Sequence, residues 1–209
     1  IILAAGNGKR MHSTLPKVMH KVGGKTMLEH VLISAKKLNP KSINVVINSR
    51  IEDIKINFKN YKINWLNQEE QKGTADAVNT ALPNLKKEDH VLVLYADTPL
   101  IDYKLLERFI NYMPESDAKV LTVTLENPFG YGRIIREQTE KEIISMIVEE
   151  TEANDTQKNI KECNTGIVFS SVGVLKNLIS KVESNNSKKE FYLTDIVSIA
   201  KEKDLVVAP

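Results

Sequence analysis

The residue types best suited to chemistry gather in one loop near the start of the chain. The segment LAAGNGKRM (3–11) follows an apolar run, and Pro16-Lys17 comes shortly after it. Glycines such as Gly6 let a backbone approach a ligand closely, and successive backbone N–H groups in such a turn bind anions. Arg10 and Lys17 would add full positive charges. This combination predicts a polyphosphate as the ligand of the loop.

Two better-known phosphate-binding motifs do not fit this chain. The dinucleotide fingerprint needs a small residue at position 11, where Met11 stands. The P-loop needs a glycine at position 19, five residues before GKT (24–26), and that residue is Met19. We therefore interpret GGKT as the start of a helix. Gly6 and Gly8 alone fit a plain strand-to-helix turn equally well, and the nearby Arg10 and Lys17 favour phosphate binding.

The elements that must position the loop alternate between short β-branched runs and helical patterns. Strands are expected at 1–5, 42–48, 91–95 and 120–125, and helices at 26–38, 74–82, 102–113 and 191–201. This alternation predicts an α/β fold with a mainly parallel central sheet and helices on both faces. After residue 126 the strand-like runs 133–136, 143–148 and 165–170 predict a smaller antiparallel β lobe. Ligands of such sheets bind at the carboxyl ends of the strands, where the loop at 3–11 would lie.

A carboxylate follows one of the buried strands. Asp97 comes directly after VLVLY (91–95), at the same edge of the sheet as the phosphate loop. Magnesium favours one or two carboxylates together with substrate phosphates, so Asp97 is the candidate metal ligand. The alternative is an Asp that caps the next helix, a role that suits Asp102 better.

Composition excludes several classes of partner. The chain has 29 Lys and Arg against 27 Asp and Glu, and this balance argues against nucleic acid or an anionic membrane as the partner. No apolar run approaches the roughly 20 residues that span a bilayer. The single cysteine, Cys163, is expected to be buried, and it favours a reducing cytoplasm. Both ends of the 209-residue chain read as cut.

Six further blocks follow the opening loop in order. They are QEEQKGT (68–74), YADTPL (95–100), NPFGYGRI (127–134), IVE (147–149), NTG (164–166) and YLTD (192–195). From its first residue to its last, the chain resembles sugar-nucleotide pyrophosphorylases. The resemblance is to the uridyltransferase domain of the bacterial bifunctional N-acetylglucosamine-1-phosphate uridyltransferase/glucosamine-1-phosphate acetyltransferases.

This resemblance implies a fold and a reaction. The fold is a Rossmann-like nucleotidyltransferase fold, and residues 1–209 would form the uridyltransferase domain. The substrates are UTP and N-acetylglucosamine 1-phosphate, the products are UDP-N-acetylglucosamine and pyrophosphate, and the cofactor is magnesium. The product would supply cell-wall precursors, both peptidoglycan and lipopolysaccharide. A C-terminal β-helix, which acetylates glucosamine 1-phosphate and forms trimers, would be absent here.

Residues 1–209 alone are then expected to be monomeric. A second metal ligand, an Asn, is expected beyond Pro209, so this fragment should fold and bind nucleotide but turn over poorly.

The resemblance also implies a role for each matching residue. Arg10 and Lys17 would be catalytic, and Asp97 would hold the metal. Gln68, Gly73 and Thr74 would read the uracil, with Leu3, Ala4, Ala5 and Gly6 near the base, ribose and phosphates. Tyr95, Gly132, Glu149, Asn164 and Thr194 would bind the sugar. Without the resemblance, Gln68 reads as a loop residue and Glu149 as a solvated strand-end residue, as we expect of Glu150 and Glu152.

Two departures from the family pattern lie in these blocks. Ala96 stands in the substrate-binding block where Gly is usual, and its methyl group would crowd the nucleotide. Ala75-Asp76 stands where Gly-His is usual, and Asp76 would add negative charge near the nucleotide. Two alternatives also stay open: a nucleotidyltransferase that uses CTP or dTTP, and a nucleotide-binding regulatory module without catalysis.

Overall fold

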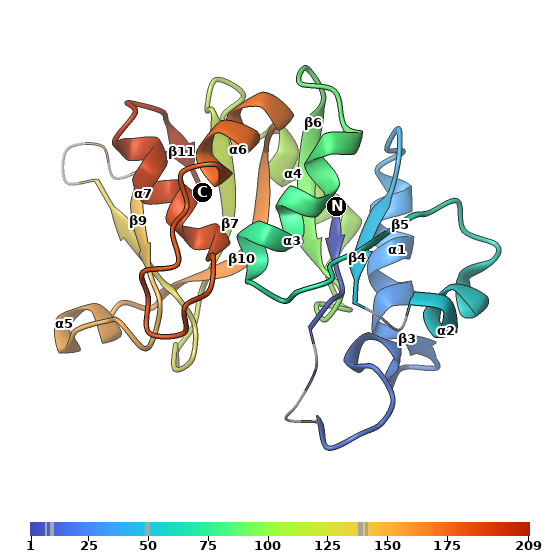
Figure 1. Cartoon of the computed structure of the whole chain (residues 1–209). Helices are drawn as coiled ribbons and strands as arrows, with labels where there is room; N and C mark the ends of the chain where they lie inside the picture. The colour runs from blue at the N-terminus through green and yellow to red at the C-terminus, as the bar shows by residue number, and fades with distance from the viewer. Residues whose placement is uncertain (7, 9–10, 49–50, 138–139, 141) are drawn as a thin grey trace.

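The structure, a computed structural model, describes residues 1–6, 8, 11–48, 51–137, 140 and 142–209. Among these residues, nine strands form one sheet that is covered by helices on both faces (Figure 1). The strands are β1 (Ile2–Leu3), β4 (Asn44–Ile47), β5 (Asn64–Asn67), β6 (His90–Tyr95), β7 (Ala118–Thr124), β8 (Arg133–Arg136), β9 (Ile144–Val148), β10 (Glu162–Ser171) and β11 (Val207–Ala208). They run in the order β11-β7-β10-β6-β1-β4-β5, and β8 joins β10 and β9 at the side. A separate hairpin joins β2 (Lys21–Val22) and β3 (Lys25–Thr26).

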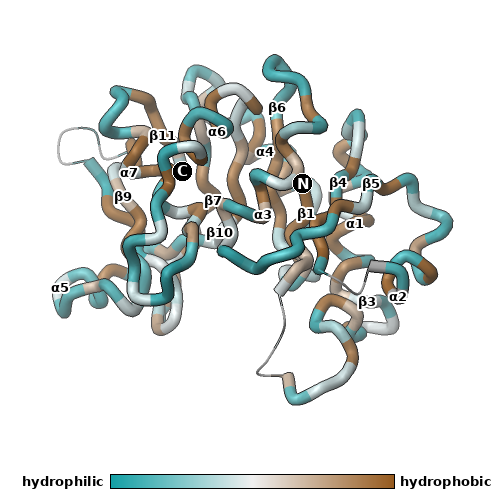
Figure 2. The backbone as a smooth tube through the Cα atoms, in the orientation of Figure 1, coloured by the Kyte–Doolittle hydropathy of each residue, from teal (hydrophilic) through white to brown (hydrophobic). Residues whose placement is uncertain are grey.

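The centre of the sheet is parallel, and its side chains alternate between two cores. Strand β1 pairs in parallel with β4 and β6, and β4 pairs in parallel with β5. Ile2 packs into one hydrophobic cluster and Leu3 into the other, because successive strand residues point to opposite faces. The strands in the middle of the molecule are apolar because both of their faces pack into a hydrophobic cluster (Figure 2).

Helices bury one apolar stripe against each face. The helices are α1 (Met27–Lys37), α2 (Ile51–Lys55), α3 (Thr74–Ala81), α4 (Tyr103–Asn111), α5 (Asp155–Lys158), α6 (Val172–Ile179) and α7 (Ile196–Lys201). Helices α3, α6 and α7 contribute to the cluster that contains Leu3, and α1 and α4 to the cluster that contains Ile2 (Figure 1). No helix among the described residues is long and apolar enough to cross a membrane.

The capping residues explain where two of the predicted helices begin. The Thr26 hydroxyl accepts a hydrogen bond from Glu29 N, and the Asp102 carboxylate accepts one from Lys104 N, so α1 and α4 begin one residue later than predicted. GGKT differs from the prediction, because Gly23 and Gly24 form the turn between β2 and β3. The last predicted helix is divided into a 3-10 turn, η5 (Leu193–Asp195), and α7.

The predicted antiparallel lobe exists, but one of its three strands belongs mainly to the central sheet. Strands β8 and β9 form an antiparallel pair, and β8 joins β10 at Cys163. The longer part of β10 lies between β6 and β7 and runs antiparallel to both. Alternating patterns look the same in either setting, so the sequence could not distinguish them. Strand β5 and helices α2, α5 and α6 were not predicted.

The carboxyl ends of the parallel strands meet at one edge of the sheet. Ala4 N donates to Val46 O at 2.8 Å, and Ala96 N donates to Leu3 O at 3.0 Å. Gln68 N donates to Ile47 O at 2.8 Å, beyond the end of β5. These backbone hydrogen bonds extend the pairing of the strands beyond their ends and hold the following loops next to one another.

Candidate functional site

A cavity of about 630 Å³ opens at this edge of the sheet. Ten predicted site residues line it: Leu3, Ala4, Ala5, Gly6, Lys17, Gln68, Gly73, Thr74, Tyr95 and Asp97. The cavity also involves residues that the sequence did not single out as ligand contacts, namely Gly8, Met11, Val18, Gln71, Ala77 and Glu190. Gly8 and Gln71 stand inside quoted motifs and could have been found there, whereas Glu190 lies in a polar segment without any such signal. The predicted catalytic Arg10 lies outside the described residues.

One end of the cavity carries charge. Lys17 Nζ lies 2.5 Å from Asp97 Oδ2, and about a third of each side chain is exposed, 31% and 35%. Lys17 begins a 3-10 turn whose next two residues, Val18 and Met19, are buried and anchor it. Gly8 has a φ of +57°, and a Cβ there would lie 2.8 Å from Lys17 Cβ. The close approach of the loop to Lys17 therefore requires glycine at position 8.

The lining of the cavity also includes apolar side chains and one side-chain amide that is held in place. Leu3 and Ala77 supply apolar surface, and Gln68 is only 4% exposed. Gln68 Nε2 donates to Gly73 O at 3.2 Å and to Asp76 Oδ2 at 2.7 Å. Asp76 does not line the cavity itself, but it lies directly behind Gln68, which does. Its carboxylate is used to hold Gln68.

Thr74 links the loop of residues 68–74 to a segment that is distant in sequence. Its hydroxyl accepts from Leu193 N at 2.9 Å, across 119 positions of the chain. Beside it, Ala75 N donates to Phe191 O at 2.9 Å, and Phe191 N donates to Lys72 O at 2.7 Å. Thr74 was predicted to read the base, and the structure shows that its oxygen also has this bridging role.

The predicted sugar-binding residues also lie together, although they come from separate elements. Thr194 Oγ1 donates to Glu149 Oε1 at 3.0 Å, and Asn164 N donates to Gly132 O at 2.9 Å. A Cβ at Gly132 would lie 3.7 Å from both Asn164 Cβ and Glu149 Cδ. Tyr95 lines the large cavity and also a small void of about 10 Å³ that Asn164 and Thr194 help to line, so Tyr95 lies between the two groups of residues.

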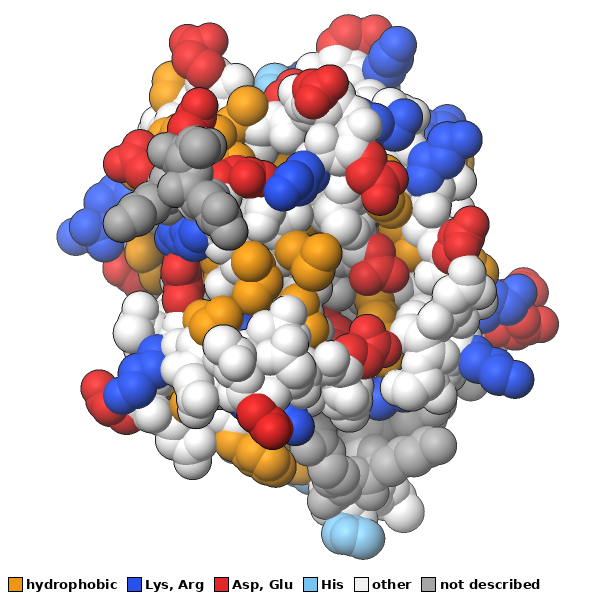
Figure 3. All heavy atoms as spheres, turned by 90° about the vertical axis from the view of Figure 1, so that its left-hand side faces the viewer, with side chains coloured by type: hydrophobic (Ala, Val, Ile, Leu, Met, Phe, Trp, Pro, Cys, Tyr) orange, Lys and Arg blue, Asp and Glu red, His pale blue; other side chains and the backbone are white. Residues whose placement is uncertain are grey.

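Burial and neighbouring carboxylates control the ionisation of Tyr95 and Asp195. Burial raises the pKa of the Tyr95 phenol well above its ordinary range, so the hydroxyl stays protonated and can donate. Burial, followed by the charges of Glu152 and Glu149, raises the pKa of Asp195 to about 6. Figure 3 shows the side of the molecule that holds the antiparallel lobe, where acidic and basic side chains are both spread around a hydrophobic centre.

Two further sequence expectations need correction. Glu150 is not a freely solvated residue, because its carboxylate lies 2.7 Å from the guanidinium of Arg133, which is 1% exposed. The pair ties the start of β8 to the segment after β9, and Gly130 N in the preceding loop donates to the same carboxylate at 3.0 Å. Ala96 is fully buried and packs in the cluster with Ile2, on the face opposite Leu3. Ala96 is also not among the residues that line the cavity.

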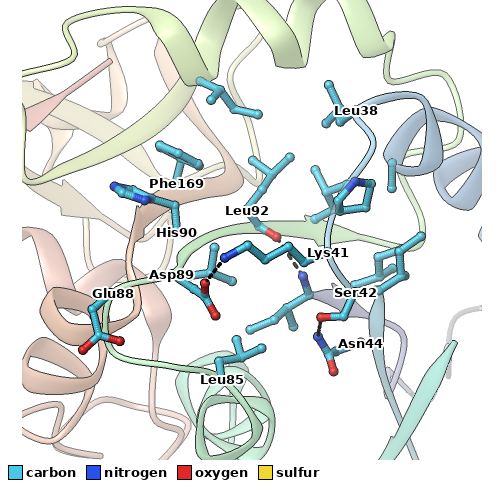
Figure 4. Close-up of a pocket in the computed structure, with 18 residues that line it drawn as sticks. Leu38, Lys41, Ser42, Asn44, Leu85, Glu88, Asp89, His90, Leu92 and Phe169 are labelled. Atoms are coloured by element: carbon cyan, nitrogen blue, oxygen red, sulfur yellow. Dashed lines mark hydrogen bonds and ion pairs between the residues drawn. The ribbon is translucent and has the colours of Figure 1, made fainter.

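A second cavity lies at the opposite edge of the sheet, where the parallel strands begin (Figure 4). It measures about 400 Å³, and its walls are apolar side chains such as Leu38, Leu92 and Phe169. An ion pair of 2.5 Å between Lys41 and Asp89 crosses it. It holds none of the predicted site residues, so the cavity at the carboxyl ends is the candidate site.

The charged end of the candidate site was tested as a place for magnesium. In the described part of the chain, no group of three or more His, Cys, Asp or Glu side chains is arranged to hold a metal ion. Asp97 nevertheless lines the cavity beside the phosphate loop. One carboxylate, substrate phosphates and water make up a common magnesium environment, and Asp97 fits it.

Comparisons with known proteins agree with this geometry. The family described as "MobA-like NTP transferase domain" matches residues 1–157. Proteins named "Bifunctional protein GlmU" from two Pseudomonas putida strains are 45% identical over 208 residues, which is 100% of this chain. The chain spans 45% of the length of these relatives.

Solved structures share the fold at low sequence identity. A UDP-glucose pyrophosphorylase complexed with UDP-glucose superposes with a TM-score of 0.77 at 17% identity, over 99% of this chain and 88% of that one. An inositol-1-phosphate CTP transferase from T. maritima gives 0.76 at 17% identity, over 99% and 82%. The α/β fold with a mainly parallel central sheet is therefore confirmed.

Proposed function

Because this chain belongs to the MobA-like NTP transferase domain family, we propose that it is a uridyltransferase that makes UDP-N-acetylglucosamine. Its substrates are UTP and N-acetylglucosamine 1-phosphate, as the resemblance in sequence implies. The observation that carries the proposal is the cavity that brings ten of the predicted site residues together, with Tyr95 between this cavity and the residues Asn164 and Thr194. The 45% identity to bifunctional GlmU proteins over the whole chain supports it.

The reaction needs positioning and positive charge rather than a protein nucleophile. A phosphate oxygen of the sugar phosphate attacks the α-phosphorus of UTP, and the bond from that phosphorus to the bridging oxygen breaks. Pyrophosphate leaves with the electron pair. Two anions must approach each other, so Lys17 and Arg10 would neutralise charge on the phosphates while Gly6 and Gly8 allow close backbone contact.

The lining of the cavity suits the parts of a nucleotide. Lys17 and Asp97 would face the phosphates and the metal, and Leu3 and Gln68 would face the base. The sugar hydroxyls and the N-acetyl group meet Glu149, Asn164 and the backbone at Gly132. Glu149 accepts from Thr194 and has further acceptor capacity for a sugar hydroxyl.

We also propose that Asp97 holds the magnesium ion. When bound, the ion would neutralise charge on the nucleotide phosphates. In this structure the Asp97 carboxylate pairs with Lys17, so the ion and the ammonium compete for the same oxygen. Asp97→Asn should therefore weaken magnesium-dependent binding of UTP in calorimetry, whereas binding without magnesium should change much less.

The deciding experiment measures pyrophosphate release with UTP, CTP and dTTP in parallel, each with N-acetylglucosamine 1-phosphate, with and without magnesium. Residues 1–209 and a version that continues past Pro209 should both be measured, and the longer version should be the more active. Lys17→Ala should lower the rate, and Lys21→Ala is the matched control, since Lys21 is exposed on β2 and outside the cavity.

The outcomes separate the alternatives. A clear preference for UTP supports a uridyltransferase, and a preference for CTP would make the chain a cytidylyltransferase. Binding of UTP without turnover in the longer version would indicate a regulatory module. In sedimentation, residues 1–209 alone should behave as a monomer, because the resemblance assigns trimer formation to a separate C-terminal β-helix.

A further inference from the structure

Asp76 accepts a hydrogen bond from the side-chain amide of Gln68, which the proposed function places against the base. It lies in the first turn of α3, and its carboxylate borders a shallow hollow that also includes Gln68, Lys72 and Thr80. Gln68 borders both this hollow and the large cavity, so its side chain separates the two. Gln68 is 4% exposed, which leaves its amide few alternative positions.

The neighbours of Gln68 determine which way its amide faces. Gly73 O and Asp76 Oδ2 lie 3.2 Å and 2.7 Å from the same amide atom. A carbonyl and a carboxylate only accept hydrogen bonds, so that atom must be the nitrogen. Turning the amide over would set its oxygen against both acceptors, which is unfavourable in a buried position.

This orientation leaves the amide oxygen of Gln68 for a ligand. Both N–H groups of the amide are used, and Oε1 has no hydrogen-bond partner among the described residues. We infer that this unpartnered oxygen faces the cavity, where it would favour a ligand that presents a donor. Uracil and thymine present a donor at N3. Cytosine presents a lone pair at N3, which would repel the oxygen, and the donor on that edge is the neighbouring N4 amino group instead.

We propose that Asp76 is a positioning residue that sets base specificity by holding the Gln68 amide with its oxygen toward the cavity. Held in this way, Gln68 accepts from the imide N3–H of uracil or thymine and disfavours cytosine. The inference rests on the proposed function, because it takes the base to lie against Leu3 and Gln68 in the cavity. A site built to pair with one hydrogen-bonding edge rejects another strongly.

The test measures the dissociation constants of UTP, CTP and dTTP by calorimetry for the parent chain and for three variants. Asp76→Ala removes the charged acceptor, and we expect the preference for UTP over CTP to fall about tenfold. The ratio of UTP to dTTP should not change, because both bases share the imide edge. Asp76→Asn should retain most of the preference, since its amide oxygen can still accept from Gln68.

Glu70→Ala is the matched control. Glu70 is an exposed acid of the same loop, it pairs with Lys72, and it accepts neither of the hydrogen bonds that the Gln68 amide donates. We expect it to retain the parent preference. A second readout needs no ligand: the two side-chain N–H resonances of Gln68 should be well separated and slowly exchanging in the parent chain, and both features should diminish in Asp76→Ala.

Three other results would overturn the inference, and each can be told apart from the others. Asp76→Ala with the parent ratio of UTP to CTP refutes the role of Asp76 and leaves the proposed function intact. Equal weakening of all three nucleotides shows that Asp76 only supports the loop. A parent chain that binds CTP as tightly as UTP refutes the proposed uridyl specificity, and this inference with it.

Discussion

Gly73 is the position where a single methyl group should be most disruptive. Its φ of +128° and ψ of 178° lie in a region that is almost restricted to glycine. A Cβ there would lie 2.4 Å from Phe191 O and 2.6 Å from Phe191 N. Those two atoms make the hydrogen bonds that hold the segment after Glu190 onto residues 72–75.

The expected loss of stability in Gly73→Ala has two parts. The backbone conformation costs about 1–3 kcal/mol for a residue with a side chain. Moving Phe191 away weakens its bonds to Ala75 N and Lys72 O, at about 1 kcal/mol each. The total is about 3–5 kcal/mol, and the displaced segment should also lower the affinity for UDP-N-acetylglucosamine.

Two other glycines separate these contributions in urea unfolding curves. Gly6→Ala should change the unfolding free energy by less than about 1 kcal/mol, because a Cβ there meets nothing within 4 Å and φ is not positive. Gly130→Ala has equally open space but a φ of +85°, so it should show only the conformational part. If Gly73→Ala loses no more stability than Gly130→Ala, the contact with Phe191 does not constrain the loop and the reasoning fails.

Three further predictions concern catalysis and pH. Arg10→Ala should lower kcat by a factor on the order of 100–1,000, and Arg10→Lys should restore it only partly, since a bidentate contact is lost; a near-normal kcat would remove Arg10 from the mechanism. Glu149→Ala and Asn164→Ala should raise KM for N-acetylglucosamine 1-phosphate and leave KM for UTP nearly unchanged, and steady-state kinetics with each substrate varied will show whether UTP binding suffers instead. Folded Asp195 keeps its proton up to about pH 6, against 3.8 ordinarily, so the protein should lose stability as pH rises between these values. Asp195→Asn should therefore match the parent near pH 4 and exceed it by ~1 kcal/mol at pH 7, a figure reduced for solvent screening of a half-buried group; equal unfolding free energies at pH 7 would contradict the raised pKa.

Most of the fold followed from local patterns. Apolar residues at helical spacing and the capping residues Thr26 and Asp102 indicated α1 and α4 to within two residues. The buried runs indicated β4, β6 and β7. These features depend on residues close in sequence, so they can be recognised from the sequence alone. Helix α6 was missed, because VGVLKNLI (172–179) carries apolar residues on several sides and an internal glycine.

The candidate site divides in the same way. The sequence indicated the glycine loop, Lys17 and Asp97, because each belongs to a short motif beside a strand end. The cavity confirms that these residues lie together. Arg10 lies outside the described residues. The resemblance identified Gln68 but not the reason for its orientation. That reason is Asp76, which the sequence presented only as an added charge near the nucleotide.

The chain by itself determined the residue types, the order of the elements and the edge of the sheet at which a ligand would bind. Only the tertiary structure decided that Thr74 meets Leu193, that Thr194 meets Glu149, and that β10 lies inside the central sheet. Such contacts join residues 45 to 119 positions apart. Their strength depends on burial and on the geometry of partners brought together by packing, and no local pattern encodes either one.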